Sequence, residues 1–168
     1  MQCKCKEEFN INSSQSTIHF ISLVPELLFK SRSILESINQ KTQLEESICS
    51  FSCENPNYFF HNFLDILSKK FTITEQKEIK IFVENNKNPL TLNSILKSKP
   101  LYLYLNYIND QTFFDILYNE SFTSHFQSIV DIKKKNIYGY EALIRGVLPN
   151  GDLVYPDEIF TKSARNNT

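Results

Sequence analysis

Two strand-like runs joined by a lysine-rich turn constrain the fold of this 168-residue chain more than any other feature. They read SHFQSIVDIKKKNIYGYEALIRG and extend from Ser124 to Gly146. Apolar and polar residues alternate on both sides of the turn, which is the pattern of half-buried strands. The sequence therefore predicts an antiparallel hairpin with residues 133–135 at its tip.

The two faces of this predicted hairpin differ in chemistry. Alternation places Gly139, Glu141, Leu143 and Arg145 on one face of the second strand, and Tyr138, Tyr140, Ala142 and Ile144 on the other. On the first strand, Gln127, Ile129 and Asp131 share a face. One face thus offers a carboxylate and a guanidinium, and the opposite face is fit for burial against helices.

Glu141 and Arg145 have two interpretations. An ion pair, or a solvated strand face, explains both without any chemistry. The alternative is a hard-metal carboxylate beside an anion-binding arginine, which suits a phosphate ester because Mg²⁺ prefers oxygen ligands and arginine forks onto phosphate. After the hairpin, LPNGDL predicts a turn, and Pro156 with Asp157 and Glu158 predicts the first turn of a helix.

The preceding 120 residues predict short strands and helices. STIHFISLV (residues 16–24) and ESICSFSC (46–53) have the composition of strands. A helix is expected from Pro25, and a second one with Asn55 as its N-cap. The apolar stripe of that second helix comprises Phe59, Phe60, Phe63, Leu64 and Leu67.

Further helices are expected downstream. TITE (residues 72–75) fits a capping box, and the helix that it opens is expected to bury Ile79, Phe82 and Val83 and to end near Asn85. LYLYLNYI (101–108) is consistent with a strand or a helix, and a helix is favoured because NDQTFFDIL then supplies a cap and a further short helix. The sequence predicts an α+β domain over residues 1–121, followed by a separate segment over 122–168.

Charge and hydropathy limit the classes of partner. Eighteen basic residues face 19 acidic ones, so the net charge of −1 gives no case for nucleic acid or an anionic membrane. No apolar run reaches the roughly 20 residues of a membrane-spanning helix, and the N-terminus has no signal-peptide core. A cytoplasmic location is expected.

Cysteine and histidine supply the other candidate ligands. Cys3, Cys5, Cys49 and Cys53 could together bind one zinc ion, but their spacing is not that of a zinc knuckle. Cys49 and Cys53 fall on one strand face with Phe51, so buried structural thiols are the preferred interpretation and zinc is not expected. His19 and His61 have no carboxylate at ligand spacing and are interpreted as structural.

The segment from Ser124 to Thr168 resembles the opening of the EAL domain of cyclic-di-GMP phosphodiesterases. The similarity lies in HFQSIVD, then GYEALIRG, then NGDLVYPDEIFTKSAR, at the separations that the family shows. The preceding region, with its early cysteine pair and its TSHFQSIV junction, is more weakly similar to the small N-terminal domain of one EAL subgroup. The resemblance implies a variant TIM-like (β/α) barrel, of which residues 122–168 would supply the first hairpin and the start of the first helix.

The resemblance also implies roles for four residues. Glu141 would be the first ligand of a catalytic Mg²⁺ or Mn²⁺, Leu143 would line the nucleotide site, Arg145 would hold a phosphate, and Gln127 would touch the cyclic dinucleotide. The implied reaction is metal-assisted hydrolysis to linear pGpG. The sequence departs from the family at Ser128, usually proline, and at Gly146, where many members have an aromatic residue.

The family's later metal ligands would lie beyond Thr168, so the 168-residue chain is expected to be inactive alone. Such barrels need about 250 residues, and one carboxylate cannot fix two metal ions. Three hypotheses follow: the N-terminal piece of a phosphodiesterase, a non-catalytic cyclic-di-GMP receptor or protein-interaction module, and a truncated product. The open edges of the hairpin predict packing onto the N-terminal domain or self-association.

Overall fold

A computed structural model describes residues 15–85 and 89–166, and it is a mixed α+β structure. The chain divides into two compact units between Asn109 and Asp110. The boundary predicted from the sequence lies after residue 121, so the short helix α6 (Gln111–Tyr118) belongs to the unit that contains the hairpin. Among the described residues, no helix is long and apolar enough to span a membrane.

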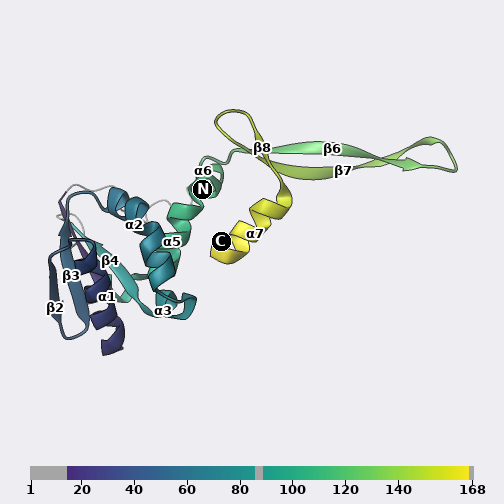
Figure 1. Ribbon diagram of the computed structural model, residues 1–168. Coiled ribbons are helices and arrows are strands. Elements are labelled where there is room, and N and C mark those ends of the chain that lie inside the picture. The colour runs from purple at the N-terminus through teal and green to yellow at the C-terminus, as the bar shows by residue number, and fades with distance from the viewer. Residues whose placement is uncertain (1–14, 86–88, 167–168) are drawn as a thin grey trace. The chain divides into compact units, whose positions relative to one another are not determined.

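The N-terminal unit is built on a five-stranded antiparallel sheet in the order β2-β3-β1-β4-β5 (Figure 1). Its strands are β1 (Ser16–Ile21), β2 (Thr42–Glu45), β3 (Ile48–Cys53), β4 (Lys80–Glu84) and β5 (Lys99–Pro100). The predictions of β1 and β3 are confirmed, whereas the four-residue β2 was not predicted. The first strand along the chain is thus the central strand of the sheet.

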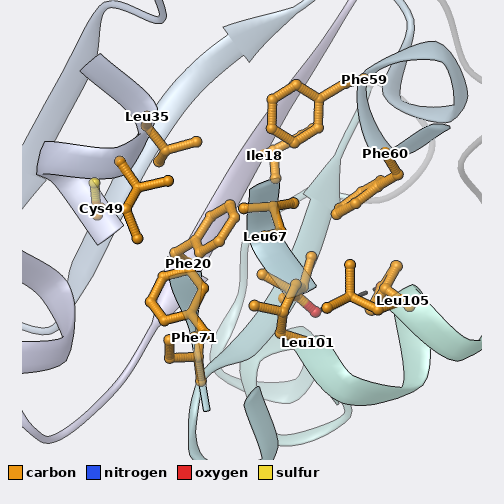
Figure 2. Close-up of a cluster of buried hydrophobic side chains, with 14 of the residues drawn as sticks. Ile18, Phe20, Leu35, Cys49, Phe59, Phe60, Leu67, Phe71, Leu101 and Leu105 are labelled. Carbon is orange, nitrogen blue, oxygen red and sulfur yellow. Dashed lines mark hydrogen bonds between the residues drawn. The ribbon is translucent and has the colours of Figure 1, made fainter. Parts of the chain in front are cut away.

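The described part of this unit also contains helices, three of which supply side chains to the core cluster on the sheet. The helices are α1 (Pro25–Ser37), α2 (Pro56–Lys70), α3 (Ile73–Glu78), α4 (Leu92–Leu96) and α5 (Leu101–Asn109). The core joins alternate residues of β1, Ile18 and Phe20, to Leu35 of α1, Leu67 of α2 and Leu101 of α5 (Figure 2). Each of these five side chains is fully buried, which makes this cluster the main source of stability in the unit.

Helix starts follow the expected local signals. The Asn55 Oδ1 atom accepts a hydrogen bond from the backbone N–H of Tyr58 at 3.0 Å, and Pro56 opens α2. At α3 both halves of the capping box are present, since the Glu75 carboxylate accepts from the N–H of Thr72 and the Thr72 hydroxyl accepts from the N–H of Glu75. The α5 and α6 helices are also confirmed.

The helix expected to run from the capping box to Asn85 is a wrong prediction. The α3 helix ends at Glu78, and residues 80–84 form β4, which pairs antiparallel with β1. The run from Ile79 to Val83 has three consecutive apolar residues at its end and is rich in β-branched residues, so it fits a buried strand as well as a helix. Because β1 has an open edge beside it, strand pairing satisfies both strands' backbone groups and overrides the helical pattern.

The second unit contains the predicted hairpin. Strands β6 (Phe122–Asp131) and β7 (Asn136–Val147) pair antiparallel, and the short β8 (Leu153–Val154) adds to the end of β7 (Figure 1). The predicted turn brings Gly151 to a φ of +89°, a conformation that favours glycine. Helix α7 (Pro156–Asn166) begins at the predicted proline.

Candidate functional site

The register of the hairpin brings the sequence-predicted residues onto one face. Gln127 lies directly opposite Glu141, His125 opposite Leu143, and Thr123 opposite Arg145. Directly opposed residues of an antiparallel pair point to the same side, about 4.5–5.5 Å apart at their Cβ atoms. Gln127, Glu141, Leu143 and Arg145 therefore form one continuous strip, which we call the Glu141 face.

The simpler explanation of Glu141 and Arg145 holds in part: a solvated strand face fits the exposed Glu141, but the two side chains form no ion pair. Their Cα atoms are about 13 Å apart along the strand. The Arg145 guanidinium instead lies 4.7 Å from the ring centroid of Tyr155, and its Nη1 donates to the carbonyl oxygen of Ile144 at 2.8 Å. Glu141 is exposed and forms no hydrogen bond or ion pair with the residues described.

The opposite face of the hairpin is apolar and exposed. Phe126 is 69% exposed and Tyr140 is 62% exposed, although the alternation predicted a face for burial. A register shift between Ile129 and Val130 leaves Tyr138 as the additional residue of β7, at 80% exposure. Within the described ranges, this face has no covering layer of helices.

The Glu141 face does not by itself provide a site for a resident metal ion. Mg²⁺ needs near-octahedral oxygen coordination, and this face supplies one carboxylate from Glu141 and one amide oxygen from Gln127. Within residues 15–85 and 89–166, no group of three or more His, Cys, Asp or Glu side chains lies close enough to hold a metal. What the face can offer is a carboxylate, an amide and a guanidinium in a row beside Leu143, which suits a polar anionic ligand.

The cysteines that the structure describes are structural thiols. Cys49 is fully buried in the core and Cys53 is half-buried, and both are free. Burial raises the pKa of the Cys49 thiol to about 11, and burial also raises the pKa of Cys53. Both thiols are therefore protonated near neutral pH in this environment. Cys3 and Cys5 lie outside the described residues.

His19 has a carboxylate partner, contrary to the interpretation from the sequence. Its Nε2 lies 2.9 Å from Oε2 of Glu84, and its Nδ1 lies 2.8 Å from Oγ of Ser50. These partners are 65 and 31 residues away along the chain and come from the strands on either side of β1. The predicted structural role fits, because the imidazole is 5% exposed with both ring nitrogens in hydrogen bonds. His61 is exposed.

Glu84 is held in its charged form by this network. Its carboxylate accepts from the backbone N–H of Leu90 at 3.0 Å and lies against His19. The hydrogen bond from Leu90 is the main cause that lowers the pKa of Glu84, with His19 contributing further. Sequence reasoning missed this array because strand β4, which positions Glu84, was predicted as helix.

A buried carboxylate fastens the last helix within the second unit. Asp110, with its side chain 2% exposed, accepts hydrogen bonds from Nη2 of Arg165 on both oxygens and from Nδ2 of Asn166. Asp110 occupies the N-cap position of α6, within the run that was expected to supply a cap, but its side chain makes no cap bond. The carboxylate instead joins the start of α6 to the end of α7.

Gly146 marks the point where the hairpin packs on α6. A Cβ atom at this position would lie 2.9 Å from Cδ1 and 3.1 Å from Cγ2 of Ile116, and 3.4 Å from Cβ of Val154. Ordinary carbon contacts are about 3.5–4.0 Å, so no side chain fits here without movement. This close approach accounts for glycine directly after Arg145, where the sequence departs from the EAL pattern.

A polar hollow of about 490 Å³ lies at one end of β1 and β3, and it is lined by Gln15, Ser16, Thr17, Ser52, Cys53 and Glu54. Glu54 is the charged side chain of this lining, and the hollow shows no convergence of catalytic groups. Comparisons with known proteins add no assignment for any of these regions: no protein-family model matches the chain, and no curated protein matches it.

Proposed function

We propose that this chain is the N-terminal portion of an EAL-domain protein of cyclic-di-GMP signalling. The motifs HFQSIVD and GYEALIRG support the proposal, and so does the register that sets Gln127 opposite Glu141 with Leu143 and Arg145 on the same face. The pairing of Gln127 with Glu141 is the single observation that carries the proposal. Alternation along β7 already places Glu141, Leu143 and Arg145 on one face, and only the register of the hairpin adds Gln127 to it.

In the proposed role, each residue contributes a distinct interaction. Arg145 binds a phosphate of the dinucleotide through its planar fork, and its stacking on Tyr155 limits the positions that the guanidinium adopts. Leu143 forms an apolar wall, and Gln127 offers both a donor and an acceptor to a base or sugar. Glu141 would bind a divalent ion, which in the family supplies an activated water.

The described residues do not hold such an ion alone, so we propose that this chain does not hydrolyse cyclic-di-GMP by itself. The hairpin would be the first two strands of a TIM-like barrel, and α7 would be the start of its first helix. The remaining ligands would come from further barrel strands, since barrels of this kind place catalytic residues on several strand ends.

A hairpin exchange tests the proposal directly. Residues 122–147 would replace the first two strands of an active cyclic-di-GMP phosphodiesterase, and formation of pGpG would be followed by chromatography. We expect the chimera to retain Mg²⁺-dependent activity, and Glu141→Gln in the chimera to abolish it. The matched control is Tyr140→Phe, which alters the neighbouring residue on the opposite face and should leave activity unchanged.

Two results would contradict the proposal. One is a correctly folded chimera without activity, since the exchanged strands would then lack the required groups. The other is hydrolysis by the 168-residue chain alone that is lost in Glu141→Ala, because the chain would then need no further ligands.

The alternative function is a non-catalytic cyclic-di-GMP receptor or a protein-interaction module. The exposed apolar face of the hairpin, with Phe126 and Tyr140, favours it. Calorimetric titration of the 168-residue chain with cyclic-di-GMP distinguishes the receptor from the N-terminal portion of a phosphodiesterase. Binding that is retained without Mg²⁺ and lost in Arg145→Ala would favour the receptor.

A further inference from the structure

The outer edge of β6 is a long strand edge that lacks protection in the described structure. The other long edge is that of β7 before its pairing with β8, and it is interrupted by the additional residue Tyr138 and carries Arg145. Edges attract other strands unless lysine, proline, bulges or short length prevent pairing. The edge strands of the N-terminal sheet have such protection, because β2 is four residues long and β5 is a Lys-Pro pair. The ten residues of β6, FTSHFQSIVD, contain no lysine, arginine or proline.

The backbone groups on this edge can be assigned. The N–H of Val147 donates to the carbonyl oxygen of Ser121 at 2.8 Å, so this pair is a hydrogen-bonded one. Hydrogen-bonded pairs alternate along an antiparallel ladder, so every second residue after Ser121 faces β7. The N–H and C=O groups of Ser124, Phe126 and Ser128 therefore point outward, away from the hairpin.

The other strand of the hairpin confirms this alternation. The N–H of Leu148 donates to the carbonyl oxygen of Asp152 at 2.9 Å, so Leu148 and Asp152 are a hydrogen-bonded pair. Gly146 and Val154, two residues away along each strand, are by alternation the next hydrogen-bonded pair between β7 and β8. Even-numbered residues of β7 thus point away from β6. On β6 the N–H of Phe122 is already bonded to the carbonyl of Glu120 at 2.8 Å, so the open stretch is centred on Phe126.

We propose that the β6 edge pairs with the β6 edge of a second copy of this chain, antiparallel and about a two-fold axis at Phe126. Phe126 then faces its own counterpart, and Ser124 faces Ser128 of the second copy in both directions. Each of these pairs exchanges two backbone hydrogen bonds. The result is a four-stranded sheet in the order β7-β6-β6-β7, and the contact is self-complementary, as a closed dimer requires.

Charge favours the antiparallel orientation. The antiparallel arrangement directs the tip of one hairpin, Lys133–Lys135, toward the start of β6 in the other copy, which follows residues 117–119 and the exposed Glu120. Residues 117–119 form the C-terminal end of α6, where the helix dipole is negative and the last turn contains no basic residue. A parallel arrangement would instead bring the two lysine tips together, and their repulsion would oppose it.

The proposal does not rest on the proposed function, because it uses the backbone pattern and charges of β6 and not the Glu141 face. It concerns the 168-residue chain, since a closed barrel would pair the same edge with one of its own strands. Sedimentation velocity and light scattering on the 168-residue chain test it. We expect a concentration-dependent species of about 39 kDa, twice the mass of one chain at 19.7 kDa. A monomer at all concentrations up to about 100 μM overturns the proposal, and so do open-ended fibres, because a two-fold contact closes.

Lysine substitutions locate the contact. Ser124→Lys with Ser128→Lys places like charges directly opposite each other across the new pair, and we expect at least a tenfold rise in the dimer dissociation constant. The matched control is Ala142→Lys, which lies on the same face but on β7 and should leave the dissociation constant within about twofold. Equal effects of the two changes would overturn the proposed edge, and circular dichroism confirms that each variant folds.

A disulfide provides a second readout that does not depend on affinity. In a background with the four native cysteines replaced by alanine, Phe126→Cys should form an intermolecular disulfide under mild oxidation, because the two Cα atoms of a hydrogen-bonded pair lie about 5.5 Å apart. Ala142→Cys, directly opposite Phe126 on β7, should remain monomeric on a non-reducing gel. Equal cross-linking of both variants would contradict the two-fold axis.

Discussion

Replacing Gly146 with alanine should destabilise the hairpin unit, and the structure gives the size of the effect. The added methyl group would lie 2.9 Å from Cδ1 and 3.1 Å from Cγ2 of Ile116, a side chain that is 3% exposed on α6. Because Ile116 is buried, it cannot move into solvent to relieve the contact. Overpacking of this kind costs about 1–3 kcal/mol.

Gly139 on the same strand is the matched control. A Cβ atom there meets nothing within 4 Å, and neither Gly139 nor Gly146 has a positive φ. Alanine at either position reduces the conformational freedom of the unfolded chain, a gain of about 0.4–1 kcal/mol that both variants share. The difference between the two variants therefore isolates the contact with Ile116.

Calorimetric unfolding of the two variants measures this difference. For a chain of this size, 1 kcal/mol shifts the midpoint by about 2–4 °C, so Gly146→Ala should unfold roughly 2–12 °C below Gly139→Ala. Gly146→Phe, which introduces the aromatic residue common in the EAL pattern, should lower the unfolding midpoint further than Gly146→Ala. If Gly146→Ala proves as stable as Gly139→Ala, the packing of β7 on α6 is not as described.

Three further predictions concern other parts of the molecule. Arg165→Ala leaves the buried carboxylate of Asp110 without its charged partner, and urea unfolding should show a loss of about 3 kcal/mol; a loss below 1 kcal/mol would mean that the pair is solvated. The pKa of Glu84 is lower in the folded state than in the unfolded state. The ionised carboxylate therefore contributes to the free energy of unfolding above the unfolded-state pKa, and this contribution is lost as the pH falls through the folded-state pKa. Relative to Glu84→Gln, the wild type should lose stability as the pH falls below the ordinary glutamate pKa of about 4.3, and parallel pH profiles would refute this. With its pKa raised to about 11, Cys49 should be only about one-thousandth thiolate at pH 8 and should react with a disulfide reagent only on unfolding; native labelling at the rate of a free thiol would contradict its burial.

Local signals were sufficient for much of the fold. The Asn55 cap, the box formed by Thr72 and Glu75, and the alternation on both sides of the lysine turn each predicted an element that is present. All of them act within a few residues, through one hydrogen bond or one strand period, so they can be read from a linear sequence. The α+β class follows from them.

Features that depend on distant partners could not be predicted. Strand β4 is apolar on consecutive residues, and only the open edge of β1 decides that it pairs as a strand. The partners of His19 then follow from that pairing, 31 and 65 residues away. Alternating burial was expected to cover the apolar face of the hairpin, whereas Phe126 remains exposed because no described element lies over it.

The same limit applies to the candidate site. Alternation alone predicts that Glu141 and Arg145 share a face, but pairing Gln127 with Glu141 requires the turn length and the register shift at Ile129. The stacking of Arg145 on Tyr155 involves residues on opposite sides of the Pro-Asn-Gly turn. Neither the distance nor the ring orientation could be obtained from spacing.

The central position of β1 has a consequence for synthesis of the protein. Residues 16–21 leave the ribosome first, yet the strands that flank them end at Cys53 and Glu84. At about 5–20 residues per second, several seconds pass in which an apolar segment, STIHFI, has an open edge on one or both sides. During this interval the unpaired backbone groups of β1 can pair with other strands, and the interval ends when β4 emerges and pairs with the second edge of β1.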